Sequence, residues 1–321
     1  MNLAFLIDPP DSLHIEKDTS FALMLEAQKR GHSLYILERG DLSFSEGKLT
    51  TRARAASVVD DAEKPFTLSA YQNHDAAFFD ILFIRTDPPF NTDYITDTWL
   101  LSHASTGSAQ VPGKKPVILN HPNGLRTINE KIWAAQFADF TPPTLITADI
   151  HAYKTFLKKH ETVVVKPTDG FGGSSVFIVK AGDKNAAVVF ETLQKTSRYI
   201  IVQAYLAAAT EGDKRILLLN GEILGAVLRH HNQEDHRNNF AAGGKAQKAT
   251  ITATDRAICA ALKPHLQALG IFFAGIDIIG RKLIEVNVTS PTCLREMQRF
   301  YDENLAEKII LAAENRAHGK I

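Results

Sequence analysis

The 321-residue sequence has few cysteines, no long apolar run and no excess of charge of either sign. Its two cysteines, Cys259 and Cys293, lie far apart in the chain, which excludes a disulfide framework and fits a reducing cytoplasm. No apolar run approaches the roughly 18–20 residues of a membrane span, and the amino terminus lacks a signal-peptide pattern, so we expect no membrane partner. Because 36 basic residues balance 36 acidic ones, a nucleic-acid partner bound by bulk charge is not expected either.

What the sequence does contain is the composition of an ordinary globular protein, long enough for two or three domains. In its first third, short apolar runs alternate with helical segments, which predicts an open α/β domain. Two of these runs, 2–8 and 78–85, lead to Asp-Pro-Pro, and we expect both to end at one ligand-binding rim. The alternative is that the prolines only end the strands. Asp18 or Thr19 is expected to cap a helix that continues to Arg30.

The remaining two thirds of the chain show a pattern of strands, hairpins and helices. After a linker at residues 120–124, we expect a helix over 129–139 in which Lys131 follows Glu130. Strands are expected at 144–147, 161–167, 176–179 and 199–203, with helices at 149–160 and 185–195. A hairpin over 213–230, a helix over 254–269, and two closing helices over 292–300 and 304–316 follow.

A further hairpin, over residues 272–288, brings together three oxygen-bearing side chains. Its two apolar runs flank a three-residue turn, which places Asp277 opposite Glu285 and Asn287 on the same face. A buried face holds two carboxylates only with compensating positive charge, and Mg²⁺ typically uses one or two carboxylates together with nucleotide phosphates. We interpret the hairpin as a Mg²⁺ clamp for a nucleotide. The alternative is an exposed face with ordinary surface charges.

A glycine-rich loop, DGFGGSS at residues 169–175, follows the expected strand 161–167. Such a loop allows backbone N–H groups to approach phosphate oxygens, and Lys166 is placed to reach the same phosphates. No Gly-Lys-Ser/Thr follows, so the loop is not a Walker A loop. By itself it is a weak signal, and Lys166 could instead extend along the strand to solvent.

The hairpin over residues 213–230 carries two arginines, Arg215 and Arg229, whose guanidinium groups suit phosphate or carboxylate. In a regular ladder the two would face opposite sides of the sheet. They can serve one site only if a bulge shifts the register, and Gly225 offers a place for one. Otherwise both are surface arginines. The polar segment 231–244 that follows is long for a connection, and we interpret it as a lid that excludes water.

Several motifs occur together along the chain. In order they are DPP and KDTSFALMLEAQKRGH (8–32), RTDPPF (85–90), the glycine loop, DKR (213–215), Asn-x-Ala-Ala-Gly-Gly (239–244) and GIDIIG…IEVNVTSPTC (275–293). Over nearly its whole length the sequence thereby resembles the bacterial glutathione synthetases of the ATP-grasp superfamily. The carboxy-terminal motif is specific to that family, whereas the glycine loop alone would indicate only an ATP-grasp protein.

The resemblance implies a three-domain ATP-grasp fold of mixed α/β class, with ATP between the central and carboxy-terminal antiparallel sheets. The domains are expected at 1–121, 122–202 and 203–321, with the ATP-grasp region at about 129–314. It implies a cytoplasmic ligase that phosphorylates the cysteinyl carboxylate of γ-glutamylcysteine with ATP. The amine of glycine then attacks the acyl phosphate, which gives glutathione, ADP and phosphate. ATP and Mg²⁺ or Mn²⁺ are the implied cofactors, and a homotetramer is the implied assembly.

The resemblance also implies a role for each site residue. The ATP-binding residues are expected to be Lys131, Lys166, Gly170, Gly172, Gly173, Ser174, Gln203, Tyr205 and Leu206. The metal ligands are expected to be Asp277, Glu285 and Asn287, and the cations over the transferred phosphate Arg215, Arg229 and Arg237. The substrate residues are expected to be Asp18, Arg85, Asn239, Ser290 and Thr292.

One segment departs from the family pattern, because residues 233–239 read QEDHRNN where members tend to have glycines and a threonine before the arginine. Loss of glycine is expected to stiffen this lid. Two alternative functions stay open: another ATP-grasp carboxylate–amine ligase, which a substrate panel would separate, and a nucleotide-binding regulatory protein without turnover. The complete set of charged site residues argues against the second. Cys293 is expected to be a packed thiol, and Ser290 or Thr292 to cap the following helix.

Overall fold

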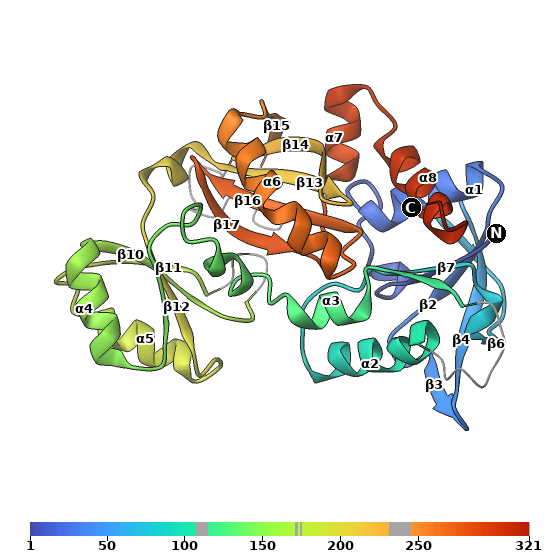
Figure 1. Ribbon diagram of the computed structural model, residues 1–321, viewed down its shortest axis with the longest axis horizontal. Coiled ribbons are helices and arrows are strands. Elements are labelled where there is room, and N and C mark those ends of the chain that lie inside the picture. Colours follow the sequence, from blue (N-terminus) through green and yellow to red (C-terminus); the bar gives the residue numbers. More distant parts are fainter. Residues whose placement is uncertain (107–114, 171–172, 174, 231–244, 321) are drawn as a thin grey trace.

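The computed structural model describes residues 1–106, 115–170, 173, 175–230 and 245–320. Its strands form three sheets that follow one another along the chain (Figure 1). Both termini lie at the end of the molecule that contains the first sheet. Within the described ranges, every helix is too short or too polar to cross a membrane.

The first sheet confirms the predicted open α/β arrangement. In the described part of the chain it has eight strands, with the path β3-β4-β2-β1-β7-β8 and with β5 and β6 paired to β4. β1, β2, β7 and β8 are parallel neighbours. The elements are β1 (Asn2–Leu6), α1 (Thr19–Lys29), β2 (Ser33–Leu37), β3 (Leu42–Ser45), β4 (Lys48–Val58), β5 (Phe66–Leu68), β6 (Gln72–Asp75), β7 (Ile81–Ile84), α2 (Thr92–Thr106) and β8 (Val117–Leu119).

Helices α1 and α2 cover opposite faces of this sheet. Successive side chains of a strand alternate between faces, so Leu3 and Phe5 belong to the core that contains α1, and Ala4 and Leu6 to the core that contains α2. The start of α1 is set by Asp18, whose carboxylate accepts a hydrogen bond from a backbone N–H of the first turn at 2.5 Å. The loop between β1 and α1 is therefore held at the carboxyl end of β1, where open sheets bind ligands.

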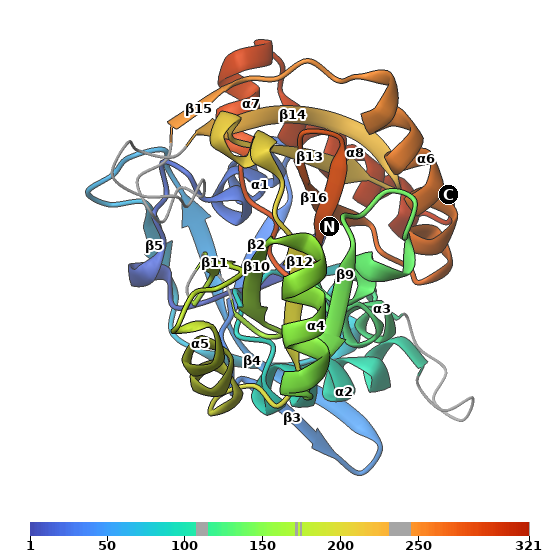
Figure 2. The same cartoon turned by 90° about the vertical axis from the view of Figure 1, so that its left-hand side faces the viewer.

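The second sheet is antiparallel and has one covered face. Among the described residues its strand order is β11-β10-β12-β9. Val163 and Val165 pack against α4 and α5, where Tyr153 stacks on Phe190 with ring centroids 4.8 Å apart, and Val164 faces the other way. Figure 2 shows α4 in front of the strands. The elements are β9 (Thr144–Thr147), α4 (Ile150–His160), β10 (Thr162–Pro167), β11 (Phe177–Lys180), α5 (Ala186–Gln194) and β12 (Ile200–Ala204).

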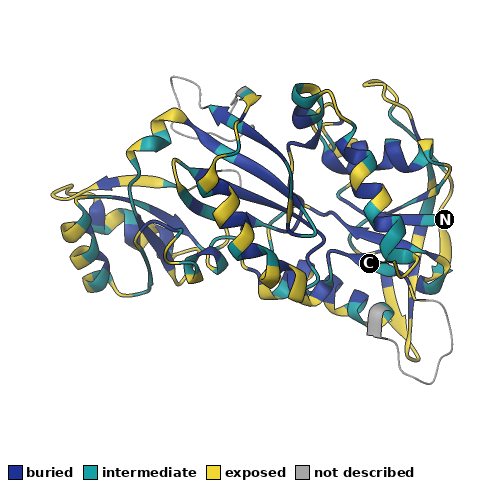
Figure 3. Ribbon diagram, turned by 45° about the horizontal axis from the view of Figure 1, so that its top comes forward, coloured by how far each residue is buried: buried dark blue, intermediate teal, exposed yellow. Residues whose placement is uncertain are grey.

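The third sheet is also antiparallel, and over the described residues its order is β15-β14-β13-β16-β17. The central strands are buried, whereas the outer faces of the helices are exposed (Figure 3). The last helix, α8, packs on α1. The carboxyl end of the chain therefore shares a hydrophobic core with the first sheet. The elements are β13 (Asp213–Leu219), β14 (Glu222–His230), β15 (Lys245–Lys248), α6 (Ala253–Ala268), β16 (Phe273–Ile279), β17 (Lys282–Asn287), α7 (Leu294–Tyr301) and α8 (Leu305–Ala317).

The segment 129–139, expected to be a helix, contains only the short 3-10 helix η3 (Trp133–Gln136). The side chain of Asn129 accepts hydrogen bonds from the N–H groups of Lys131 and Ile132, which favours a local turn. The carbonyl of Glu130 bonds to the N–H of Val286, so the backbone is held by β17 instead of by a helical partner. The expectation that Lys131 lies within a helix is therefore wrong.

The expected linker at 120–124 is wrong as well, because α3 (Pro122–Thr127) begins inside it. Proline suits the first position of a helix, and the side chain of His121 accepts a hydrogen bond from the N–H of Asn123. The strand expected at 78–85 is shorter in the structure, where β7 covers Ile81–Ile84. Residues 76–78 form a 3-10 helix instead. The helix α7 has Cys293 at its N-cap position without a side-chain hydrogen bond, so neither Ser290 nor Thr292 caps it.

Candidate active site

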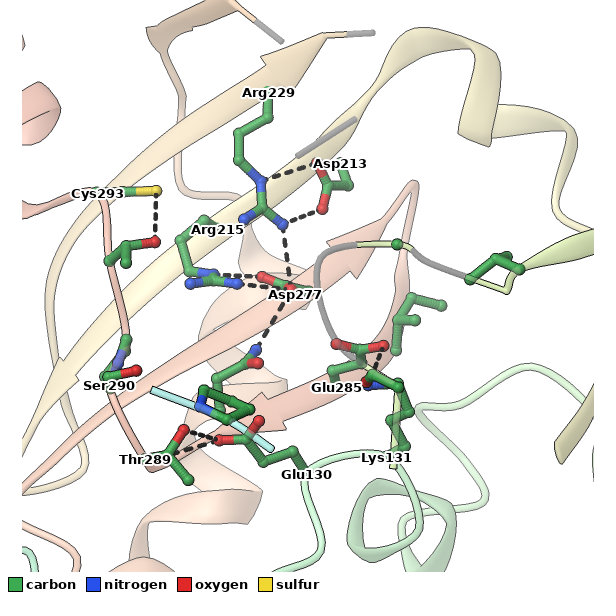
Figure 4. Close-up of a pocket in the computed structure, with 18 of the residues that line it drawn as sticks. Glu130, Lys131, Asp213, Arg215, Arg229, Asp277, Glu285, Thr289, Ser290 and Cys293 are labelled. Atoms are coloured by element: carbon green, nitrogen blue, oxygen red, sulfur yellow. Dashed lines mark hydrogen bonds and ion pairs between the residues drawn. The ribbon is translucent and has the colours of Figure 1, made fainter. Parts of the chain in front are cut away.

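A cavity of about 1320 Å³ lies between the three sheets, and most of the expected site residues line it. It is lined by the loop after β1, the glycine loop, the strands of the third sheet and the turn after β17 (Figure 4). The expected residues in its wall are Asp18, Lys131, Lys166, Gly170, Gly173, Gln203, Tyr205, Leu206, Arg215, Arg229, Asp277, Glu285, Asn287, Ser290 and Thr292.

The hairpin β16–β17 brings its three polar side chains together as predicted. Asp277 is paired with Glu285, and Asn287 lies two residues further along β17. The turn has two residues, not three, and a shift of register after Asp277 leaves Ile284 as the extra residue of a bulge. The shorter turn and the bulge together give the same pairing that a three-residue turn without a bulge would give. The predicted pairing of Asp277 with Glu285 is therefore confirmed, although its backbone geometry differs from the prediction. The amide nitrogen of Asn287 donates to Asp277 Oδ2 at 3.3 Å.

The two arginines of β13 and β14 both contact Asp277 (Figure 4). Arg215 forms a two-bond pair with this carboxylate, with Nη2 2.8 Å from Oδ2, and Arg229 Nη2 lies 3.1 Å from the same oxygen. The register of β13 and β14 shifts between Leu217 and Leu218, which leaves Leu224 unpaired. This bulge, next to Gly225, turns both arginines to one side, which was the condition for a shared site.

Charge determines the ionisation state of this group. Burial alone would raise the pKa of Asp277, but Arg215 and Arg229 outweigh it, and the pKa lies well below its ordinary value. Asp213, which forms a two-bond pair with Arg229, has its pKa raised by burial despite that arginine. Asp277 is therefore the more firmly ionised of the two acids.

A second ionic group surrounds Glu285. Lys166 Nζ lies 3.5 Å and Lys131 Nζ 3.6 Å from Glu285 Oε1. Burial would raise the pKa of Glu285, but the two lysines lower it below its ordinary value, whereas burial lowers the pKa of Lys166. Lys131 also donates to the carbonyl of Gly170, which ties the segment before η3 to the glycine loop.

The donor set at β17 fits a divalent metal ion. Asn287 uses its nitrogen toward Asp277, which leaves its carbonyl oxygen, and Glu285 has no cation closer than 3.5 Å among the described residues. Both are hard oxygen donors of the kind that Mg²⁺ prefers. Asp277 fits less simply, because both of its oxygens are hydrogen-bonded to arginine. Asp277 can bind the metal ion only if one of its oxygens gives up its hydrogen bond to arginine and contacts the metal instead.

The strand β12 leads into the side of the cavity that is lined by apolar residues of the second sheet. Val164 and Ile178 face this space, and the segment 203–206 passes along it. The N–H of Tyr205 donates to the carbonyl of Thr162 at 3.0 Å, so it serves the fold. The side-chain nitrogen of Gln203 donates to Thr144 Oγ1 at 3.0 Å. A nucleotide base bound on this side of the cavity would contact the remaining polar groups of residues 203–206.

The residues expected to face the dipeptide are divided by the structure. Asp18, Ser290 and Thr292 line the cavity, whereas Arg85 is buried and does not. Arg85 donates to Ser20 Oγ and to the carbonyl of Pro291, each at 3.0 Å. It therefore ties the first sheet to the turn after β17, and its contact with a substrate stays a prediction.

Sequence reasoning assigned no site role to several acidic residues of the cavity wall, among them Glu130, Asp8 and Asp87. Glu130 Oε1 accepts hydrogen bonds from the N–H of Val288 at 2.8 Å, from the N–H of Thr289 at 3.0 Å and from the hydroxyl of Thr289 at 2.9 Å. Asp8 accepts from the N–H of Asp87 at 2.7 Å, and Asp87 accepts from the hydroxyl of Ser290. The two Asp-Pro-Pro motifs predicted that Asp8 and Asp87 lie at a common rim. The sequence around Glu130, by contrast, predicts only a helix and gives no sign of a site.

Four expected site residues, Gly172, Ser174, Arg237 and Asn239, lie outside the described residues, as does the expected lid 231–244.

Comparison with known proteins agrees with this geometry. Residues 1–126 match the N-terminal domain of prokaryotic glutathione synthetase, and residues 130–302 match its ATP-grasp domain. The chain belongs to the prokaryotic glutathione synthetase family. It is 39% identical to the glutathione synthetases of Citrobacter rodentium (98% of this chain and 99% of that protein) and Escherichia coli K12 (98% of both), and 37% identical to that of Vibrio parahaemolyticus (all of both).

Solved structures support the fold of this family. D-cycloserine synthetase DcsG aligns with a TM-score of 0.65 at 17% identity, covering 99% of this chain and 100% of that one. An ATP-grasp RimK domain protein from Sphaerobacter thermophilus aligns with a TM-score of 0.61 at 17% identity, covering 98% of each chain. The expected ATP-grasp fold and the expected glutathione synthetase ligase are therefore confirmed, and the fold implies use of ATP with a divalent metal ion.

Proposed function

We propose that the cavity joins γ-glutamylcysteine to glycine with ATP, through an acyl phosphate of the cysteinyl carboxylate. The observation that supports it best is the arrangement of Arg215, Arg229 and Asp277 opposite Glu285, Lys131 and Lys166 in one wall. Phosphoryl transfer to a carboxylate brings two anions together, and catalysis then depends on positioning and on neutralising charge. The substrates are small molecules, in agreement with a cavity whose wall is partly polar and partly apolar.

The cations of the two ionic groups have separate tasks in this proposal. Lys131 and Lys166 bind the phosphates of ATP, with Gly170 and Gly173 of the glycine loop beside them. Glu285 and Asn287, with Asp277 after an exchange of hydrogen bonds, hold Mg²⁺, which neutralises phosphate charge when it is bound. The donors are all oxygen, which suits Mg²⁺ and Mn²⁺ alike.

The chemical steps follow from this placement. The cysteinyl carboxylate takes the γ-phosphoryl group, and ADP leaves. The glycine amine attacks the acyl carbon, the C–N bond forms, and phosphate and a proton are released. Arg215 and Arg229 stabilise negative charge in both steps, and groups of this type are worth about 3–4 kcal/mol each. Arg237 and Asn239 are proposed to complete the site on family resemblance alone.

The proposed domain limits are 1–121, 122–202 and 203–321. Each sheet lies mostly within one of these ranges, although β12 crosses the second limit. A homotetramer in the cytoplasm is the assembly that family resemblance supports, and the two buried free cysteines suit a reducing compartment. Sedimentation velocity would test the assembly.

The test of the function is coupled ADP production with the purified chain. We expect ADP release that requires ATP, Mg²⁺, γ-glutamylcysteine and glycine together, with glutathione formed in equal amount. ADP release with only one of the two amino substrates would contradict the proposal, as would turnover that prefers other acid and amine pairs in a substrate panel.

A further inference from the structure

One carboxylate in the cavity wall has no task in the proposed reaction. Glu296 lies in the first turn of α7 and lines the cavity, although its residue is only 8% exposed. Its Oε2 accepts no hydrogen bond from the part of the chain that the structure describes. Burial raises the pKa of this carboxyl, against smaller opposite effects of its own N–H and of Arg299.

The basic residues nearest to Glu296 on the same helix are engaged elsewhere. Arg295 pairs with Asp60 at 2.7 Å, and Arg299 donates to the carbonyl of Glu16 at 2.7 Å. Within the described residues, Glu296 forms no ion pair at all. A buried acceptor without a donor is costly to keep, so in a ligand cavity it indicates where a ligand supplies the donor.

Three other acids at this end of the cavity already have donors, whereas a fourth, Glu16, is exposed to solvent. Asp18 accepts from a helix N–H at 2.5 Å, Asp8 accepts from the N–H of Asp87 at 2.7 Å, and Asp87 accepts from Ser290. Their carboxylates are used by the fold. Glu296 is the one among these acids that has a buried oxygen without a hydrogen-bond donor in the described part of the chain.

Glu296 lines the same cavity as the two arginines proposed to stabilise the transferred phosphate. Cys293, at the N-cap position of α7, is close enough to Arg215 and Arg229 for both arginines to lower the pKa of its thiol, although burial raises it overall. Glu296 follows three residues later, which is a rise of about 4.5 Å along a helix. Arg215, Arg229 and Glu296 line one cavity, and a γ-linked dipeptide, which is longer than the about 7 Å of an ordinary dipeptide, can have one end at the arginines and the other toward α7.

We propose that Glu296 binds the α-ammonium group at the γ-glutamyl end of the dipeptide and makes the enzyme selective for substrates that carry it. This rests on the proposed function. In γ-glutamylcysteine the peptide bond uses the side-chain carboxyl of glutamate, so its α-ammonium stays free, at the end opposite the cysteinyl carboxylate. An ammonium group supplies the charge and the N–H donors that the buried carboxylate lacks.

The experiment compares two substrates on two enzymes. The substrates are γ-glutamylcysteine and glutarylcysteine, which differ only by the α-amino group. The enzymes are the wild type and Glu296→Gln, with Asp302→Asn as a matched control, because Asp302 is an exposed acid just after the same helix and asparagine tolerates its positive φ. KM values for ATP and glycine, and the thermal midpoint, are measured in parallel.

We expect the wild type and Asp302→Asn to prefer γ-glutamylcysteine in kcat/KM by about ten- to a hundredfold, the range for a hydrogen bond to a charged group. Glu296→Gln should lose most of that preference through a higher KM for γ-glutamylcysteine alone, with ATP and glycine unaffected. Equal losses on both substrates, an unchanged preference, or a wild type that does not discriminate would each overturn the assignment. Failure of the wild type to use either dipeptide would overturn the proposed function as well.

Discussion

At the residue scale, the cavity is governed by two carboxylates that face each other on one hairpin and keep different partners. Asp277 is held by Arg215 and Arg229, and Glu285 by Lys131 and Lys166. Each buried acid thus has two cations near it, and the surplus of positive charge suits a polyphosphate. Removal of one member of such a group leaves an uncompensated charge in a buried place.

Glu285→Gln tests the metal assignment. We expect a folded protein whose half-maximal Mg²⁺ concentration rises about ten- to a hundredfold, a range found even for groups that only orient a metal ligand. Turnover is measured in a Mg²⁺ titration. Glu222→Gln is the control, because Glu222 is an exposed acid of the same sheet outside the cavity wall. Unchanged turnover and Mg²⁺ dependence in Glu285→Gln would show that Glu285 binds no metal.

Glu130 is expected to position the turn after β17. One of its oxygens accepts three hydrogen bonds from Val288 and Thr289, so Glu130→Ala should lower the free energy of unfolding by about 1.5–3 kcal/mol. Glu130→Gln keeps an accepting oxygen and should recover much of that loss. Urea unfolding of both variants measures the difference. Equal destabilisation by alanine and glutamine would contradict the hydrogen-bond explanation.

At the element scale, two bulges decide which side chains meet. One lies in β14 and brings Arg229 to the side of Arg215, and the other lies in β17 and sets Asp277 opposite Glu285. A shift of one residue moves every later side chain to the other face of a strand. The four charged residues of the third-sheet site therefore depend on the backbone of two short segments as much as on their own identity.

The contact between α8 and the first sheet is also an element-scale feature. Arg30 donates to Glu314 through two bonds of 2.8 Å, and His32 lies 2.7 Å from the same carboxylate. The hydrogen bond from Arg30 is the main cause that lowers the pKa of Glu314 from 4.5 to about 2. A depressed acid pKa stabilises the folded state above the unfolded value and loses that contribution as pH falls.

We therefore expect Glu314→Gln to be less stable than the wild type at pH 6, with a difference that shrinks between pH 4.5 and about 2. Urea unfolding at several pH values measures it. Glu303→Gln, at an exposed acid before α8, is the control and should give no pH-dependent difference. A Glu314→Gln difference that stays constant across this range would exclude the linkage.

At the scale of the whole molecule, the cavity exists only where the three sheets meet. Arg85 joins the first sheet to the turn after β17, Lys131 joins the segment before η3 to the glycine loop, and Lys166 of the second sheet reaches Glu285 of the third. A ligand bound there contacts all three parts at once. Its binding free energy should therefore stabilise the entire chain against unfolding.

Mg²⁺ with a non-hydrolysable ATP analogue should raise the thermal midpoint of unfolding. At a ligand concentration one hundred times Kd, the free energy of unfolding rises by about 2.7 kcal/mol. Differential scanning calorimetry measures it. Lys166→Met keeps the volume of the side chain and removes the buried cation, so the gain should fall sharply in that variant. An equal shift in both proteins would place the phosphates away from Lys166.

Most strands and helices, the two site hairpins and the residue types of the site could be predicted from the sequence, whereas β5, β6 and β15 were not predicted. The predicted features depend on alternation, turn residues and local hydrogen bonding, which are properties of neighbours in the chain. The same local rules failed over 129–139, where the backbone of Glu130 bonds to a strand more than 150 residues away.

Three features could be read only from the folded chain: both arginines share Asp277, Arg85 lies behind the cavity wall, and Oε2 of the buried Glu296 has no donor among the described residues. The physical reason is that burial and the choice of a charged partner depend on segments that meet in space. The propensities of residues that are neighbours in sequence contain no information about which distant segments come into contact.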